Sequence, residues 1–211
     1  MKFINFILIT LIILLVIVSL RLYQDNLEMR RAHPATSDFA VQPDIYIENA
    51  QRDLNRHFYK TSQKDIAKAI KSMRLLENDL DSISKLAVEN AIEDLEIVEL
   101  QIQTNQTDQE LINKVFSNTL NSLAYVQLRV SEQLAEDGAT EEARYALKYA
   151  IEHLKNAMRF SDEEKQKVER EVYLTIDSII DNDLLLENEL RSTVDALLLE
   201  MDTTVLKTLK Q

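Results

Sequence analysis

The scarcity of turn-forming residues is the feature that most restricts how this chain can fold. The sequence contains one glycine and two prolines, and both prolines, Pro34 and Pro43, lie near the N-terminus. A β-sheet needs a turn every few residues, and such turns depend on glycine, proline and asparagine. From Asp44 onward, apolar residues recur instead at spacings of three and four, as on one face of a helix. The sequence therefore predicts an all-α protein.

An uncharged apolar segment near the N-terminus is predicted to insert in a membrane. Residues 3–20 contain no charged residue, no glycine and no proline. As a helix rising about 1.5 Å per residue, the segment is roughly 27 Å long, close to the hydrocarbon thickness of a bilayer. A helix that is apolar on every side is accepted by lipid but is poorly suited to the surface of a small domain. We expect residues 1–23 to form a transmembrane helix that contacts lipid through residues 3–20.

A cleaved signal peptide is the alternative to a permanent anchor. Cleavage requires small residues one and three positions before the cut, and the sequence from Val16 to Tyr23 has no such pair. The apolar run is also longer than the usual signal-peptide core of about 7–15 residues. These two features favour an uncleaved signal-anchor.

The orientation of this single span is predicted from two opposing features. Lys2 and the free amine lie before the span, whereas Arg21, Arg30 and Arg31 lie after it. Positive charge alone therefore favours a cytosolic body. A short basic head before an apolar run is typical of exported proteins. We predict that the body is extracytoplasmic, in the periplasm or cell envelope, and a cytosolic body is the alternative.

Residues 24–43 are predicted to be a tether, because the two prolines oppose a regular helix there. Residues 44–211 then form one acidic domain. A domain of this size buries about 70% of the surface that its unfolded chain exposes, so it needs no metal or disulfide for stability. The chain has no cysteine.

Capping residues divide the domain into about five helices. The residues expected to open helices are Asp81 or Ser82, Thr107 in a capping box with Glu110, Thr140, and Ser161 in a capping box with Glu164. Gly138 is expected to end a helix in the left-handed conformation. The predicted helices span 44–80, 82–104, 107–136, 140–160 and 162–209, with a pause near 61–62 and a break near 181–183.

Short connections make successive helices antiparallel, so the predicted fold is an up-and-down bundle. The helix over 140–160 carries an alanine-rich stripe that allows close approach of a neighbouring helix. The last helix has leucine triplets at 184–186 and 197–199, which place apolar residues on more than one face. This pattern suits a central helix, or a coiled-coil contact with a second copy or another protein.

The composition excludes several classes of function. The net charge of −12 repels phosphates, so nucleic-acid binding is not expected. A single glycine cannot build a phosphate loop or a dinucleotide fingerprint, and a chain without cysteine has no thiol catalysis or iron–sulfur cluster. Helix interiors also leave no free backbone amides for an oxyanion hole. We therefore expect neither an enzyme nor a cofactor.

The strongest candidate binding feature is acidic. The stretch 86–113 has no lysine or arginine, and within it Glu89, Glu93 and Glu96 fall on one helix face at spacings of four and three. Such a face is suited to docking a basic partner or to loose cation binding. The alternative is an ordinary solvated face of an acidic protein.

Histidines and tyrosines give weaker candidates. His57 follows Asp53 by four residues, so the pair would share a helix face, but no further histidine or cysteine completes a metal site. His153 is expected to be an ordinary surface or partly packed residue. Tyr145 and Tyr149, one turn apart, form either an aromatic binding ridge or a packing contact with a neighbouring helix.

These observations predict a membrane-anchored, non-enzymatic helical bundle that acts as a protein-interaction or scaffold module. The alternative is a cation- or ligand-binding bundle with a carboxylate-lined site.

Overall fold

The computed structural model describes residues 37, 39–77, 80–104, 107–180 and 198. The predicted membrane anchor, most of the tether and, apart from Leu198, the predicted helix segment beyond residue 180 lie outside these residues. Within them, none of the helices combines the length and the apolar character that a membrane crossing requires.

The described part of the chain contains six α-helices and no strand, which confirms the all-α prediction. The helices are α2 (Gln42–Asn55), α3 (Tyr59–Leu76), α4 (Ser82–Gln103), α5 (Gln109–Glu136), α6 (Thr140–Ala157) and α7 (Glu163–Ile180). The first predicted helix, 44–80, is thus two helices.

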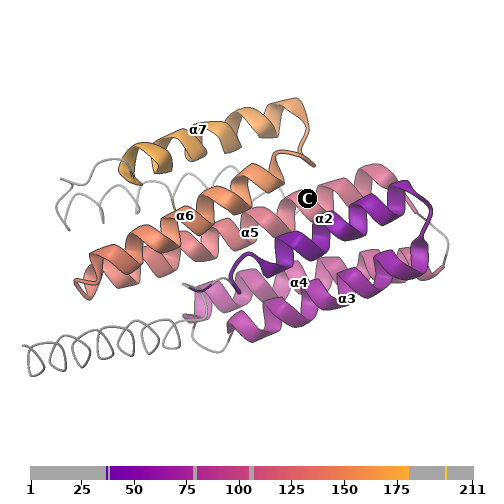
Figure 1. Cartoon of the computed structure of the whole chain (residues 1–211), viewed down its shortest axis with the longest axis horizontal. Helices are drawn as coiled ribbons and strands as arrows, with labels where there is room; N and C mark the ends of the chain where they lie inside the picture. The colour runs from indigo at the N-terminus through magenta and orange to yellow at the C-terminus, as the bar shows by residue number, and fades with distance from the viewer. Residues whose placement is uncertain (1–36, 38, 78–79, 105–106, 181–197, 199–211) are drawn as a thin grey trace, which may run out of the picture.

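The helices pack as an elongated bundle around α5 (Figure 1). Helices α2 and α3 form one antiparallel pair, α5 and α6 form another, and α4 packs against both α3 and α5. Helix α7 lies on the opposite side of the bundle from α3 and packs on α6. One hydrophobic core runs through all six helices and includes Leu198.

Helix α5 is enclosed on every side over much of its length. Every residue from Val115 to Leu128 is buried. Its closest neighbour is α6, whose buried alanines at 143, 146, 150 and 157 let the two backbones approach closely, as the alanine-rich stripe predicted. Among the described helices, α5 therefore occupies the central position.

The break between α2 and α3 falls at residues 56–58, earlier than the predicted pause near Thr61 and Ser62. His57 adopts a left-handed conformation with φ of 61°. Its N–H donates to the carbonyl of Leu54 at 2.9 Å, and the N–H of Phe58 donates to the carbonyl of Asp53 at 2.8 Å. These two bonds are a Schellman motif, which normally has glycine at the left-handed position. Histidine adopts this conformation far less often than glycine, so the end of α2 has no clear sequence marker.

The glycine that was expected to end a helix does so. Gly138 has φ of 74°. Its N–H donates to the carbonyl of Ala135, and the N–H of Ala139 donates to that of Leu134, which is the same motif as at His57. Asp137, Gly138 and Ala139 are the whole connection between α5 and α6.

Two further predicted helix starts concern α4 and α5, and one of them is wrong. Asp81 caps α4 as expected, because its carboxylate accepts from the N–H groups of Ile83 and Ser84. Helix α5 is capped by Asp108 and not by Thr107, since the Asp108 carboxylate accepts from the N–H groups of Glu110 and Leu111. An ionised oxygen is the stronger acceptor for such orphan amides, and it wins over the adjacent hydroxyl.

The expected caps of α6 and α7 are also wrong. Thr140 is the first residue of α6 and caps nothing, because the tight turn at Gly138 makes Ala139 the N-cap residue. At α7 the Asp162 carboxylate accepts from the N–H of Lys165 at 2.9 Å. The hydroxyl of Ser161 is bonded instead to the carboxylate of Glu169 at 2.7 Å.

The paired Schellman motifs generate a test of backbone strain. We expect Gly138→Ala to lower the free energy of unfolding by about 1 kcal/mol, because a Cβ is strained in the left-handed region. No heavy atom lies within 4 Å of the position of that Cβ, so the whole loss comes from the backbone. We expect His57→Gly to raise stability by about 0.5–1 kcal/mol for the same reason. Urea denaturation of the full chain, followed by circular dichroism, measures both free energies of unfolding. A change of the same sign in the two variants would contradict backbone strain as the cause.

Candidate functional site

The exposed face of α4 carries large aliphatic side chains that no other described element covers. Ile83 is 51% exposed, Leu86 57%, Ile97 53% and Leu100 59%. This face is opposite the buried stripe of α4, which matches the predicted inward residues and consists of Val88, Ala91, Ile92, Leu95, Val98 and Ile102. Burial of that stripe against α3 and α5 leaves the aliphatic face directed to solvent.

The exposed positions follow the spacing of a coiled-coil seam. Ile83 and Leu86 form one aliphatic pair, and Ile97 and Leu100 form a second pair two heptads further on. Asn90 and Glu93, both exposed, occupy the seam positions between the pairs. Alternating steps of three and four are the pattern by which one helix packs along another. We call these six residues the α4 seam.

The predicted acidic residues flank and interrupt this seam. Glu89, Glu93 and Glu96 are all exposed on α4. They line one groove of about 300 Å³ between α3 and α4, together with Arg74, Glu77 and Ile92. The structure thus brings the three predicted carboxylates onto one surface.

The charge of the groove is only partly balanced. Arg74 donates to Glu96 with an Nη2–Oε1 distance of 2.8 Å, and both side chains are about half exposed. An exposed pair of this kind contributes only about 0–1 kcal/mol to stability. Partial burial, with the nearby charge of Glu93, raises the pKa of the Asp94 carboxyl. The groove itself has four glutamates and one arginine among its lining residues, so its net charge is negative.

The expectation that His57 and Asp53 share a helix face is wrong. Because α2 ends at Asn55, His57 does not share a helix face with Asp53. Its Nδ1 lies 3.1 Å from the Tyr59 hydroxyl instead. In the ranges that the structure describes, no group of three or more histidine, aspartate or glutamate side chains is placed to hold a metal ion.

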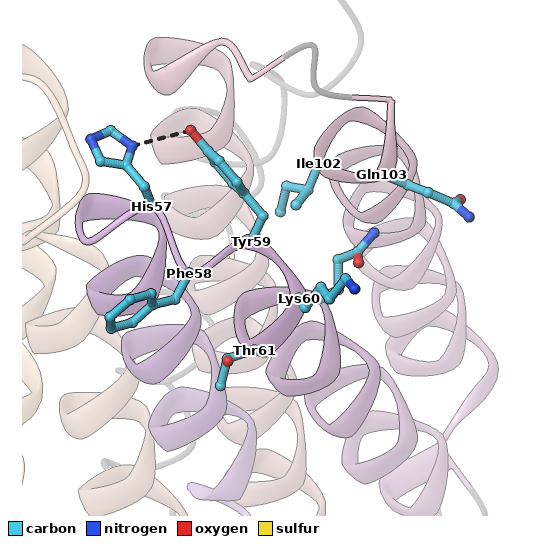
Figure 2. Close-up of a pocket in the computed structure, with 8 residues that line it drawn as sticks. His57, Phe58, Tyr59, Lys60, Thr61, Ile102 and Gln103 are labelled. Carbon is cyan, nitrogen blue, oxygen red and sulfur yellow. Dashed lines mark hydrogen bonds between the residues drawn. The ribbon is translucent and has the colours of Figure 1, made fainter.

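His57 borders a depression at the end of the bundle where α2 turns into α3. Figure 2 shows the His57 ring turned towards Tyr59, with Phe58 directed away and with Ile102 and Gln103 contributed by α4. The depression has a volume of about 560 Å³. Lys60 is the one lining residue with a fixed charge. The lining residues include the cation of Lys60 but no carboxylate that could pair with His57 as acid and base.

Tyr145 and Tyr149 lie on the outer side of α6. Tyr145 is 52% exposed, so the packing alternative is wrong for this residue. The Nζ of Lys148 lies 5.1 Å from the centre of its ring, in a cation–π contact. Tyr149 is half-buried.

His153 is fully buried, contrary to the expectation of a surface or partly packed residue. Its Nδ1 lies 2.7 Å from Oδ1 of Asp44, and Oδ2 of Asp44 accepts from Asn156 at 2.8 Å. These bonds fasten the start of α2 to the end of α6. The sequence spacing indicates this burial, because His153 lies three residues after Ala150 and four before Ala157, and both alanines belong to the apolar stripe.

A second buried polar cluster joins α7 to α5, and sequence reasoning missed it. Glu169 is fully buried. Its Oε1 accepts from Asn121 at 2.6 Å, from Ser161 at 2.7 Å and from Ser117 at 3.4 Å. Burial raises the pKa of the Glu169 carboxyl, although these hydrogen bonds oppose the shift.

Lys165 lies one turn before Glu169 on α7. Its Nζ donates to Oδ1 of Asn118 at 2.6 Å. Burial lowers the pKa of Lys165 to about 8, and the carboxylates of Glu169 and Asp162 oppose this shift. The cluster holds α7 against α5 through these hydrogen bonds, so we assign it a structural role.

Comparison of the chain with protein-family models, curated proteins and solved structures gives no match. The function of the α4 seam is therefore argued from its own geometry.

The buried carboxyl generates a prediction about pH. Because the folded-state pKa of Glu169 is raised, its contribution to stability is fully present below the unfolded pKa and is lost as pH rises through the folded pKa. We expect Glu169→Gln to be more stable than the wild type by about 1 kcal/mol near neutral pH, with the difference vanishing below about pH 4.

Urea denaturation across this pH range measures the difference. Glu171→Gln, at an exposed position on the same helix, is the matched control and should show no such trend. A Glu169→Gln variant that is less stable at neutral pH would show that the ionised carboxylate is required.

Proposed function

We propose that this protein is a membrane-tethered, non-enzymatic interaction module that binds a basic protein partner on the outer face of α4. The observation that carries the proposal is the α4 seam, in which aliphatic side chains at coiled-coil spacing lie beside exposed carboxylates. Isolated exposed aliphatic residues need no explanation, but a periodic row of them on one helix is typical of an interface.

Apolar burial supplies the attraction in this proposal. Ile83, Leu86, Ile97 and Leu100 are each exposed by more than half. Covering the exposed half of such a side chain contributes roughly 1 kcal/mol before the costs of association. The gain is modest for each residue, which suits a reversible complex.

Charge supplies the selectivity. The carboxylates of Glu89, Glu93 and Glu96 attract a basic surface and repel an acidic one. The net charge of −12 acts in the same direction at longer range. Both effects weaken as salt is added.

The membrane anchor in this proposal is supported by the sequence alone. Residues 3–20 have the length and composition of a membrane span. A membrane anchor confines the bundle to a surface, which raises its effective concentration towards partners at that membrane. An extracytoplasmic body in the cell envelope is the orientation that we propose.

A photocrosslinking experiment tests the docking face. We expect a photoreactive amino acid at Ile97 of the full chain, expressed in its own cells, to give a discrete adduct with another protein. The variant Glu89→Gln, Glu93→Gln and Glu96→Gln should reduce the adduct several-fold, because it removes the charge that attracts the partner.

The matched control is Glu152→Gln, Glu164→Gln and Glu171→Gln, which removes the same charge from exposed positions on α6 and α7. The adduct should persist in this control. Absence of any adduct at Ile97, or equal loss in both triple variants, would contradict the proposed docking face.

Membrane extraction tests the predicted membrane anchor. We expect the full chain to remain in membranes washed with alkaline carbonate, and Leu11→Arg with Leu15→Arg to release it, because an arginine near the centre of a span costs about 2.5–3.5 kcal/mol. Protease accessibility in intact and permeabilised cells then gives the side of the membrane. Full release of the unmodified chain by carbonate would exclude an integral anchor.

A further inference from the structure

We infer that the partner element of the α4 seam is a single amphipathic helix that is basic on its flanks and carries a lysine or arginine at the middle of its own apolar stripe. This inference rests on the proposed function and specifies what the docking face recognises.

The spacing of the seam selects a helix as the occupant. From Ile83 to Leu100 the seam rises about 26 Å along α4. Its steps of three and four repeat with the period of a second helix packed alongside, whereas a strand repeats every two residues. A partner helix of about 18 residues covers this length.

The middle of the seam selects a basic residue. Asn90 and Glu93 separate the two aliphatic pairs, and both are exposed. A leucine placed over Glu93 would remove water from the carboxylate without replacing its hydrogen bonds, which is costly. A lysine or arginine at that position pairs with the carboxylate and also fixes the register of the two helices.

The groove beside the seam selects basic flanks. Arg74 already pairs with Glu96. Within the described ranges, neither Glu89 nor Glu93 forms a salt bridge, and both line the groove of about 300 Å³. A long basic side chain from the partner can enter this groove and meet these two carboxylates.

A second copy of the chain is the less favourable occupant. Two α4 helices packed antiparallel would place Ile83 opposite Leu100, and Leu86 opposite Ile97, of the other copy. In this register Glu89 and Glu96 flank the seam on the same side, so Glu89 of each copy lies beside Glu96 of the other. These like charges oppose the pairing, whereas a basic helix complements them.

Designed peptides of 18 residues test the inference against the full chain in zwitterionic lipid nanodiscs, with empty nanodiscs subtracted. The first peptide has leucines at seam spacing, a central lysine and lysine flanks. The second has the same composition in a scrambled order without a stripe. The third replaces the central lysine with leucine.

We expect the first peptide to bind, by fluorescence anisotropy, about tenfold more tightly than either of the others, which is the effect of one well-placed interaction. Equal binding of the first two peptides would contradict a helical partner, but it would still be compatible with a basic partner on this face. Equal binding of the first and third would overturn the central basic residue. Failure of all three peptides would overturn the inference, and crosslinking at Ile97 would still judge the docking face separately.

A charge exchange gives the most specific test. We expect Glu93→Lys to reverse the preference, so that a peptide with a central glutamate binds more tightly than the peptide with a central lysine. Glu164→Lys, on the exposed side of α7, is the control and should leave the preference unchanged. A shift of the full chain to a dimer that Ile97→Asp abolishes would instead identify a second copy as the occupant and overturn the inference.

Discussion

The complete enclosure of α5 is the constraint on which the rest of the bundle depends. Because every residue from Val115 to Leu128 is buried, each face of α5 needs a neighbour. Helix α6 approaches closely through alanines, α7 supplies Glu169 and Lys165 to the polar side chains of α5, and α4 packs on it through its apolar stripe. Placing the stripe of α4 against α5 and α3 determines which side of α4 meets water. The α4 seam is thus exposed because the opposite face of α4 is needed to cover α5. The acidic residues beside the seam lie on a helix whose orientation is set by that packing.

The two kinds of polar group in this bundle have different uses. Buried groups such as Asp44, His153 and Glu169 are bonded across helices that are distant in sequence, so they specify how helices fit together. Within the described residues, the exposed carboxylates of Glu89 and Glu93 make no salt bridge and line a groove at the surface. This division agrees with an interaction module, since recognition requires a rigid scaffold below an accessible surface.

Much of the helical fold was predictable, because periodicity and a left-handed glycine at 138 are local properties of the chain. Local patterns also placed Glu89, Glu93 and Glu96 on one face. The cap at Asp108 was missed because two adjacent residues can each cap, and only the path of the chain chooses between them. The end of α2 was missed because His57 adopts a conformation that favours glycine. The partners of His153 and Glu169 lie on other helices, and no local pattern pairs residues that are far apart in sequence.

The cluster around Glu169 gives α7 a unique axial position. A helix held by aliphatic side chains alone can slide by one turn and recover similar contacts, because leucine and isoleucine have little directional preference. A carboxylate oxygen that accepts from Asn121 and Ser161 within 2.7 Å loses both donors after such a slide. Burying the Glu169 carboxylate costs solvation energy, but its directional hydrogen bonds favour one axial register of α7 over the others.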